Sequence, residues 1–134
     1  MEIQFYEKPG CVNNTRQKLM LTAEGHNVIA HSLLTETWTA ESLRNFFGNM
    51  VVSDWFNNSA PRIKSGEVVP SNFDETSAIQ AMLNDPLLIR RPLIAVAGHF
   101  VCGFDNELVK QLLNNADASH LKSCPNLATD KSCD

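Results

Sequence analysis

The chain has 134 residues, of which 43% are hydrophobic and 19% are charged, and its formal net charge is −4. A domain of this length can bury about two thirds of its unfolded surface without disulfide staples. The acidic balance provides no basic face for nucleic acid, and no apolar run approaches the ~18 residues of a membrane span. Four widely spaced cysteines and no signal-peptide pattern predict a reduced, cytoplasmic protein.

The first predicted unit is a strand, a tight loop and a helix. Residues 1–5 form a short alternating run, typical of a buried strand. The loop is indicated by Pro9 and Gly10, and a helix is expected over about residues 12–24. Gly25 ends this helix, and residues 27–33 form the next strand. The two strands should be parallel and joined by a right-handed crossover.

Cys11 falls at the start of that helix. The first backbone amides there, including that of Asn14, have no intrahelical acceptor, and the helix dipole adds about half a positive charge. Lys8 and Arg16 add basic character nearby. This setting favours a thiolate with a pKa below the ordinary ~8.5. The alternative is a buried, inert cysteine that packs as a small apolar side chain.

Helical pieces are expected between the second and third strands. Residues 37–41 open one helix with a threonine cap, and residues 52–57 form a short second one. A third, capped within residues 71–74, ends before Pro86. The aromatic residues of this region are expected to form core rather than a docking face: Trp38, Phe46, Phe47, Trp55 and Phe56.

The last predicted unit is an antiparallel hairpin with a turn near Gly98, followed by a helix. Cys102 lies in the second strand of the hairpin and is expected to be buried, with disulfide formation to Cys11 as the alternative. Asp105 is expected to cap the final helix. The buried face of that helix is expected to be Leu108, Val109, Leu112, Leu113 and Ala116.

The order β-α-β, inserted helices, β-β-α predicts an α/β protein with a thioredoxin-like fold, built on a small mixed four-stranded sheet flanked by helices. The domain is expected to span residues 1–117, with the helical insertion at about 38–84. Residues 118–134 turn polar and are expected to form a flexible C-terminal tail.

Two segments carry a family resemblance. Residues 6–16, around Pro-Gly-Cys, and residues 85–92, ending in Arg-Arg-Pro, resemble the arsenate reductase-like branch of the thioredoxin superfamily, which includes the Spx-type regulators. The resemblance covers roughly residues 2–115. Within this branch, three further segments resemble the nitrogenase-associated proteins of nitrogen-fixing bacteria: residues 38–44, 55–57 and 63–67.

The resemblance implies roles for two residues. In arsenate reductases of this type, the cysteine at the Cys11 position attacks arsenate, and the arginine before a cis-proline, here Arg91 before Pro92, binds the oxyanion. Two further family arginines are replaced at the matching positions by Asn57 and Gly103. Each missing guanidinium removes a charge-assisted contact worth about 1.5–3 kcal/mol, so arsenate reduction is not expected. Arg90, next to the site arginine, is expected on the surface.

The resemblance to the Spx-type regulators leads to a further expectation. Their switch uses a second cysteine three residues after the first, where this chain has Asn14. No disulfide within the loop is therefore expected.

Three interpretations of the site remain open. In the first, Cys11 is the single nucleophile of a thiol-redox protein and forms a mixed disulfide with glutathione as co-substrate, with glutaredoxin as a further candidate partner. The anion-binding groups would be Arg91, Arg16 and the helix amides, including that of Asn14, beside Pro92. In the second, the fold is a non-catalytic module that binds nitrogenase or its assembly proteins.

The third interpretation concerns the tail, where metal or sulfur could be bound by His120, Cys124 and Cys133. Their spacing matches no standard zinc pattern and supplies no clear fourth ligand. We therefore expect no metal site and no tightly bound cofactor.

Overall fold

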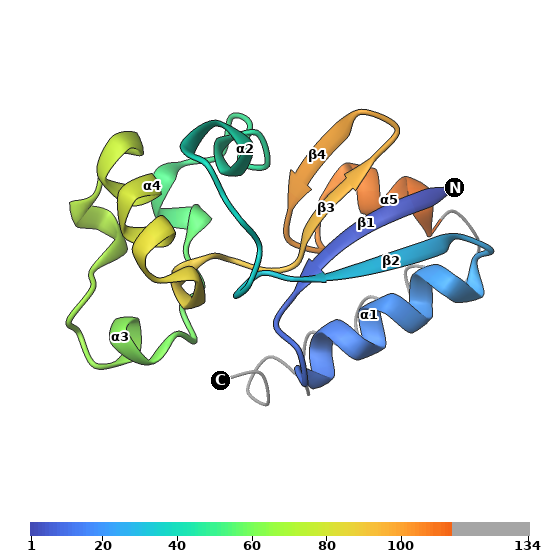
Figure 1. The fold of residues 1–134 in the computed structure, drawn as a ribbon, viewed down its shortest axis with the longest axis horizontal. Helices are drawn as coiled ribbons and strands as arrows, with labels where there is room; N and C mark the ends of the chain where they lie inside the picture. The colour runs from blue at the N-terminus through green and yellow to red at the C-terminus, as the bar shows by residue number, and fades with distance from the viewer. Residues whose placement is uncertain (114–134) are drawn as a thin grey trace.

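The computed structural model describes residues 1–113. Its elements run along the chain as shown in Figure 1. They are β1 (Glu2–Glu7), α1 (Val12–Ala23), β2 (Asn27–Ser32), α2 (Ala40–Arg44), η1 (Val52–Trp55), α3 (Pro61–Lys64), η2 (Pro70–Asn72), α4 (Glu75–Asn84), η3 (Pro86–Leu88), β3 (Leu93–Val96), β4 (His99–Cys102) and α5 (Glu107–Leu112).

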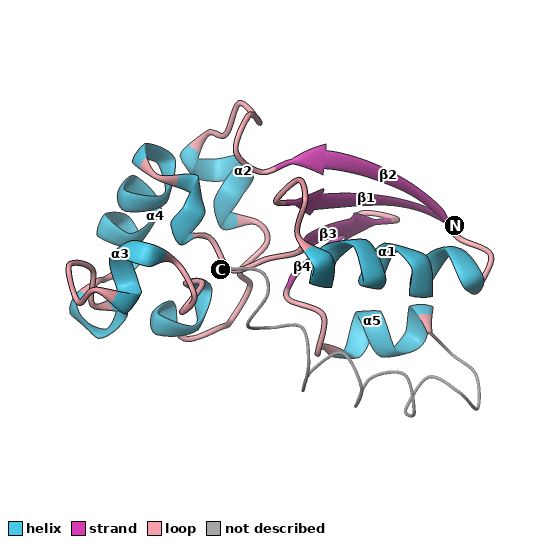
Figure 2. Ribbon diagram, turned by 90° about the horizontal axis from the view of Figure 1, so that it is seen from below, coloured by secondary structure: helices cyan, strands magenta, loops and turns pink. Residues whose placement is uncertain are grey.

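The four strands form one mixed sheet in the order β2-β1-β3-β4. β1 pairs in parallel with β2, whereas β3 is antiparallel to both β1 and β4. Helices α1 and α5 lie along one face of the sheet (Figure 2), and the helical insertion, from α2 to α4, lies beyond the carboxyl end of β1. The predicted thioredoxin-like topology is confirmed.

The β-α-β unit follows the sequence pattern closely. Gly10 has a positive φ of 83°, so the chain can turn sharply after β1, and α1 begins at Val12. The helix ends at Ala23, where Gly25 takes a φ of 91°. The salt bridge from Lys18 Nζ to Glu7 Oε1, 2.9 Å long, ties the helix to the end of β1.

Two hydrophobic clusters stabilise the fold. One lies between the sheet and its two helices and includes Phe5, Leu21 and Val109. The other fills the helical insertion, where the rings of Phe47 and Trp55 stack with centroids 4.5 Å apart. The prediction that the aromatic residues of this region form core is confirmed for the five named above, four of which are buried and one, Trp38, partly buried.

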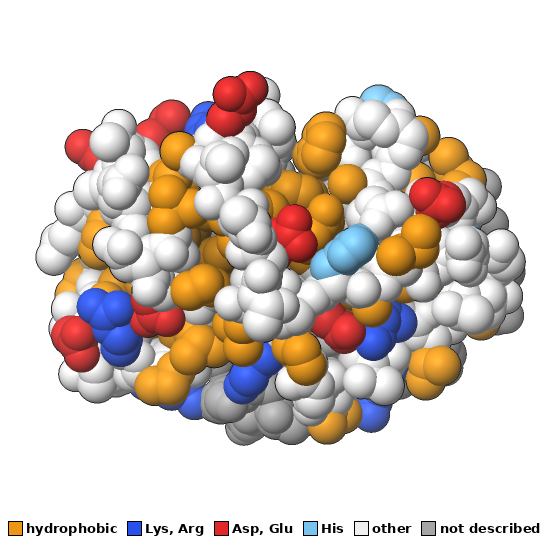
Figure 3. Space-filling model, in the orientation of Figure 1, with side chains coloured by type: hydrophobic (Ala, Val, Ile, Leu, Met, Phe, Trp, Pro, Cys, Tyr) orange, Lys and Arg blue, Asp and Glu red, His pale blue; other side chains and the backbone are white. Residues whose placement is uncertain are grey.

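Aromatic contacts join the insertion to the sheet. Tyr6 of β1 packs against Trp38 with ring centroids 5.1 Å apart, and Phe100 of β4 packs against Phe46 at the same distance. Hydrophobic side chains gather in the hollow between the two parts of the molecule in Figure 3. Burial raises the pKa of the Tyr6 hydroxyl, and the nearby Glu36 carboxylate raises it further.

The structure corrects the predicted boundaries at two helices. The helix expected to open at residues 37–41 is the five-residue α2, capped by Thr39 through a capping box with Ser42. The chain then continues in turns. The final helix is capped by Asn106 rather than Asp105, because the Asp105 carboxylate pairs with Arg90 instead.

Three short elements were not predicted. Each begins with a proline at its first or second position: Pro61 in α3, Pro70 in η2 and Pro86 in η3. Proline is favoured there because its fixed φ suits a helix and its missing N–H costs no hydrogen bond. The expected tail, residues 118–134, and Ala116 lie outside the described residues. Within the described part, no helix is long and apolar enough to cross a membrane.

The Phe47–Trp55 stack gives a test of the insertion core. Phe47 is 1% exposed, so Phe47→Ala is expected to lower the free energy of unfolding by about 3–5 kcal/mol through lost burial and the cavity left behind. Leu19→Ala, at a position 64% exposed on α1, is the control and should change it by less than about 0.5 kcal/mol. Urea unfolding of both variants under reducing conditions measures this. Equal losses would contradict the assignment of Phe47 to the core.

Candidate functional site

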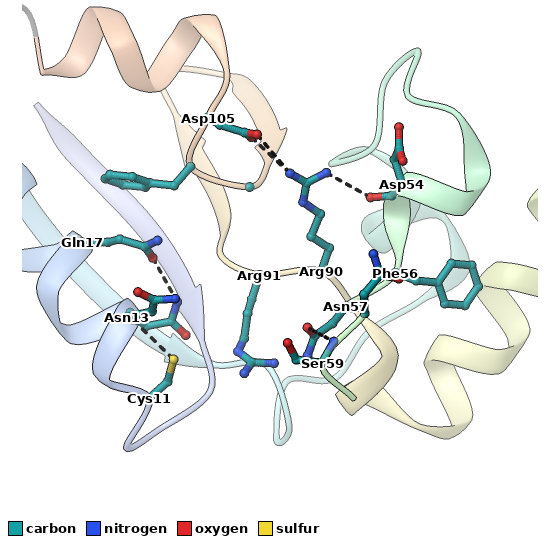
Figure 4. A pocket seen from close by; sticks show the side chains of 14 residues that line it. Cys11, Asn13, Gln17, Asp54, Phe56, Asn57, Ser59, Arg90, Arg91 and Asp105 are labelled. Carbon is teal, nitrogen blue, oxygen red and sulfur yellow. Dashed lines mark hydrogen bonds and ion pairs between the residues drawn. The ribbon is translucent and has the colours of Figure 1, made fainter. Parts of the chain in front are cut away.

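A polar pocket of about 360 Å³ lies where the β1–α1 loop meets the helical insertion (Figure 4). Its walls come from the first turns of α1, the segment around and after η1, the residues before β3 and the loop after β4. The lining residues are Cys11, Asn13, Asn14, Gln17, Asp54, Phe56, Asn57, Asn58, Ser59, Arg90, Arg91, Gly103, Phe104 and Asp105.

Cys11 is the N-cap residue of α1. Its Sγ accepts a hydrogen bond from the backbone N–H of Asn14 at 3.4 Å, and its own N–H donates to the Lys8 carbonyl at 3.1 Å. The residue is 3% exposed, yet it belongs to neither hydrophobic cluster and opens on the polar pocket. In this structure Cys11 is disulfide-bonded. Its sulfur therefore lies at the positive end of a helix dipole.

Asn14 holds the cysteine loop in place. Its side-chain oxygen accepts a hydrogen bond from the backbone N–H of Lys8 at 3.1 Å, and its amide nitrogen donates to Gln17 Oε1 at 3.1 Å. The residue is 1% exposed. Asn14 was predicted for its backbone amide, which the structure directs at the Cys11 sulfur. The structure adds that its side chain fixes the loop.

Arg91 enters the pocket from the strand side. In Figure 4 its guanidinium extends toward the side of the pocket where Cys11 lies, whereas the Arg90 side chain extends in the opposite direction. The Arg91–Pro92 peptide bond is cis, as the resemblance implied. Pro92 is buried behind the pocket, and its carbonyl accepts a hydrogen bond from Gly103 N–H at 2.8 Å. Pro92 thus shapes the backbone without lining the cavity.

Arg90 lies at the rim of the pocket and is not the simple surface residue expected from the sequence. Its Nη2 lies 3.2 and 3.3 Å from the two carboxylate oxygens of Asp105, and its Nη1 donates to the Asp54 carbonyl at 3.3 Å. Arg90 therefore joins η1 to the loop after β4. A Cβ on Gly103 would lie 3.2 Å from Asp105 Oδ1 and 3.3 Å from Arg90 Nε.

The structure brings together most of the predicted site residues. Cys11, Asn14 and Arg91 line one pocket, and so do Asn57 and Gly103, the two positions where the resemblance implies arginines. Arg16 is exposed on α1 and does not line the pocket, so the structure does not bring it to the site as expected.

The sequence analysis missed several lining residues. On α1 these are Asn13 and Gln17, and after Phe56 they are Asn57, Asn58 and Ser59 in their role as a polar wall. The signal for Gln17 was its i+3 spacing from Asn14, since residues at this spacing share a helix face. The polar run directly after the buried Trp55-Phe56 pair was the signal for the wall.

Cys102 differs from Cys11 in every respect that governs reactivity. It is 4% exposed within the hydrophobic cluster of the insertion, and its Sγ donates to the Arg90 carbonyl at 3.4 Å. Burial raises the pKa of this thiol to about 12; Asp105 raises it too, while Arg90 opposes the shift. Cys102 is a free thiol. The prediction that it is a buried small side chain is confirmed.

Comparison with known proteins places these observations in a family. The model of the ArsC family matches residues 12–112. The chain belongs to the ArsC family. It is also 47% identical over 134 residues to an uncharacterized 15.7 kDa protein of Rhodospirillum rubrum from the draG 3′ region, an alignment that covers 98% of this chain and 94% of that protein.

Solved structures of ArsC-like proteins share the fold. A putative ArsC family related protein from Bacteroides fragilis and the arsenate reductase from Vibrio cholerae superpose with TM-scores of 0.71 and 0.69. Each is 21% identical and covers 84% of this chain and 98% of its own. A possible arsenate reductase from Streptococcus mutans has a TM-score of 0.66, 24% identity and coverage of 78% and 92%. The chain therefore has the architecture of an ArsC-like, thioredoxin-like thiol-redox family.

The raised pKa of Cys102 predicts a specific pH dependence. An unfolded chain releases this proton near the ordinary value of 9.0, whereas the folded protein holds it to about 12. The stability that Cys102 contributes is therefore fully present below pH 9 and decreases as the pH rises from 9 toward 12. Urea unfolding of the reduced protein and of Cys102→Ala between pH 8 and about 10.5 should show a difference that is constant up to pH 9 and then shrinks. A difference that stays constant throughout would contradict the shift.

Proposed function

We propose that this protein is a thiol-redox protein that exchanges disulfides through Cys11, with glutathione as co-substrate. The observation that carries the proposal is the position of the Cys11 sulfur: it accepts the Asn14 N–H at the start of α1, inside the pocket that Arg91 also lines. A helix N-terminus and a nearby guanidinium both favour a thiolate, so we propose a lowered pKa for reduced Cys11. Its disulfide-bonded state in this structure represents the oxidised half of the cycle.

The proposed reaction is a balanced exchange. The Cys11 thiolate attacks one sulfur of glutathione disulfide, a bond forms between Cys11 and a glutathionyl group, and the sulfur–sulfur bond of the substrate breaks. The departing glutathione thiolate takes a proton from water. A second thiol can then attack the mixed disulfide and return Cys11 to its reduced state.

The pocket suits a small anionic peptide. Its volume of about 360 Å³ lies at the lower end of the usual range for ligand sites, ~300–1,000 Å³. Glutathione carries carboxylates, which Arg91 can bind with a bidentate hydrogen-bond pair. The backbone amides at the start of α1 offer further donors to an anion. Asparagine and serine side chains on the facing wall can hydrogen-bond the peptide amides.

Arsenate reduction is not the activity we propose. Arsenate would need several cationic donors, and two of the pocket positions that carry them in the family are Asn57 and Gly103 here. Arg90 does not replace them, because its guanidinium is engaged by the Asp105 carboxylate and the Asp54 carbonyl. The two aspartates on the pocket lining add negative charge.

Alkylation of the reduced protein tests the proposed thiolate. The iodoacetamide reaction of Cys11, followed by peptide mass spectrometry, should have a rate midpoint below pH ~8.5. Arg91→Gln should raise this midpoint, because it removes a positive charge from the pocket. It should also weaken glutathione disulfide binding by about ten- to a hundredfold, in line with the loss of ~1.5–3 kcal/mol per charge-assisted contact.

Two control variants complete this test. Cys11→Ser should form no glutathione adduct at residue 11, whereas Arg62→Gln, an exposed arginine that does not line the pocket, should behave as the wild type. A midpoint at or above 8.5 together with no glutathione adduct would overturn the redox proposal.

The nitrogen-fixation setting is also part of the proposal, and its support is the sequence resemblance of residues 38–44, 55–57 and 63–67. If the chain instead acts as a non-catalytic module, its binding should not need the thiol. A pull-down with purified nitrogenase components and both wild type and Cys11→Ser separates the two. A redox role predicts that trapping through a disulfide is lost in the variant, whereas undiminished binding by both proteins would favour the module.

A further inference from the structure

The proposed redox cycle needs a thiol that resolves the Cys11 disulfide, and the domain itself offers no suitable one. Cys102 is a free thiol, buried in the hydrophobic cluster of the insertion with its sulfur directed at the Arg90 carbonyl. A buried thiol with no path to the pocket cannot attack a mixed disulfide on Cys11. The chain has two more cysteines, Cys124 and Cys133, which lie outside the described residues.

We propose that Cys124 is the resolving cysteine and that the two-electron oxidised form of this protein contains a Cys11–Cys124 disulfide. The inference rests on the proposed thiol-exchange function. A second observation supports it independently: Cys11 is disulfide-bonded in this structure while Cys102 is not.

The fold sets the distance that the chain must cover. His26 follows the carboxyl end of α1, and its Nε2 lies 2.8 Å from the Leu112 carbonyl, so the last described residues begin beside that end of the helix. Cys11 caps the other end. A helix of 12 residues is about 18 Å long. The connection from Leu113 to Cys11 must therefore run roughly the length of α1.

Chain length and local charge favour Cys124 over Cys133. Cys124 stands eleven residues beyond Leu113, and eleven residues reach about 36 Å at full extension, twice the length of α1. The cost of closing a loop rises with its length, which favours the nearer cysteine. Lys122 precedes Cys124 by two residues and favours its thiolate, whereas Asp134 follows Cys133 directly and disfavours that one.

The proposed step is balanced. The Cys124 thiolate attacks the Cys11 sulfur of the mixed disulfide, the Cys11–Cys124 bond forms, and the bond from Cys11 to the glutathionyl group breaks. The departing glutathione takes a proton. In total one glutathione disulfide gains two electrons and becomes two glutathione molecules, while the two protein thiols lose them. A dithiol reductant, or two further glutathione molecules, restores the reduced protein.

Intact-mass and peptide-mapping mass spectrometry of the full chain provides the test. The reduced protein is mixed with glutathione disulfide at about 0.1 mM and quenched with acid at intervals. The wild type should pass through a short-lived glutathione adduct to a form that has lost two hydrogens and contains a Cys11–Cys124 peptide pair. In Cys124→Ser the adduct on Cys11 should persist about tenfold longer, because an intramolecular thiol acts at an effective concentration on the order of 1 mM.

Cys133→Ser is the matched control and should behave as the wild type. A persistent adduct in the wild type would overturn the inference and leave the proposed function intact. An intramolecular disulfide that still forms in Cys124→Ser, or one that is lost in Cys133→Ser, would overturn the assignment to Cys124. If no variant that retains Cys11 reacts with glutathione disulfide, both the inference and the proposed function fail.

Discussion

The N-terminal turn of α1 is the constraint on which the rest of the site depends. A helix must leave its first backbone N–H groups without helical acceptors, and here the Cys11 sulfur accepts one of them. The turn at Gly10 makes this possible, because its positive φ lets the chain leave β1 and enter the helix within a few residues. Asn14 then fixes the loop from inside the helix.

The two described cysteines show how position decides chemistry in this fold. Cys11 and Cys102 are both nearly inaccessible, at 3% and 4% exposure, so burial alone does not distinguish them. Cys11 faces amides and a polar pocket, whereas Cys102 faces apolar side chains that raise its pKa to about 12. The difference in proposed role follows from the groups around each sulfur.

Much of this arrangement could be predicted from the sequence, because local rules govern it. The alternation of β1, the Pro-Gly turn and the glycine after α1 determined the β-α-β unit, and the cysteine at the helix start followed from it. Polar pairing over long range was harder. The partners of Arg90 are Asp54 and Asp105, which lie 36 and 15 residues away, so no local pattern announces them. For the same reason the cap of α5 was assigned one residue too early.

Gly103 has a further consequence for how this pocket could change over evolution. The glycine has a φ of 89°, a conformation that other residues adopt only with strain, and any side chain there would press on the Arg90–Asp105 pair. An arginine could enter at this position only if the ion pair moved and the backbone relaxed together. A single substitution therefore cannot rebuild a multi-arginine oxyanion site, and the ancestry of the pocket is locked behind coupled changes.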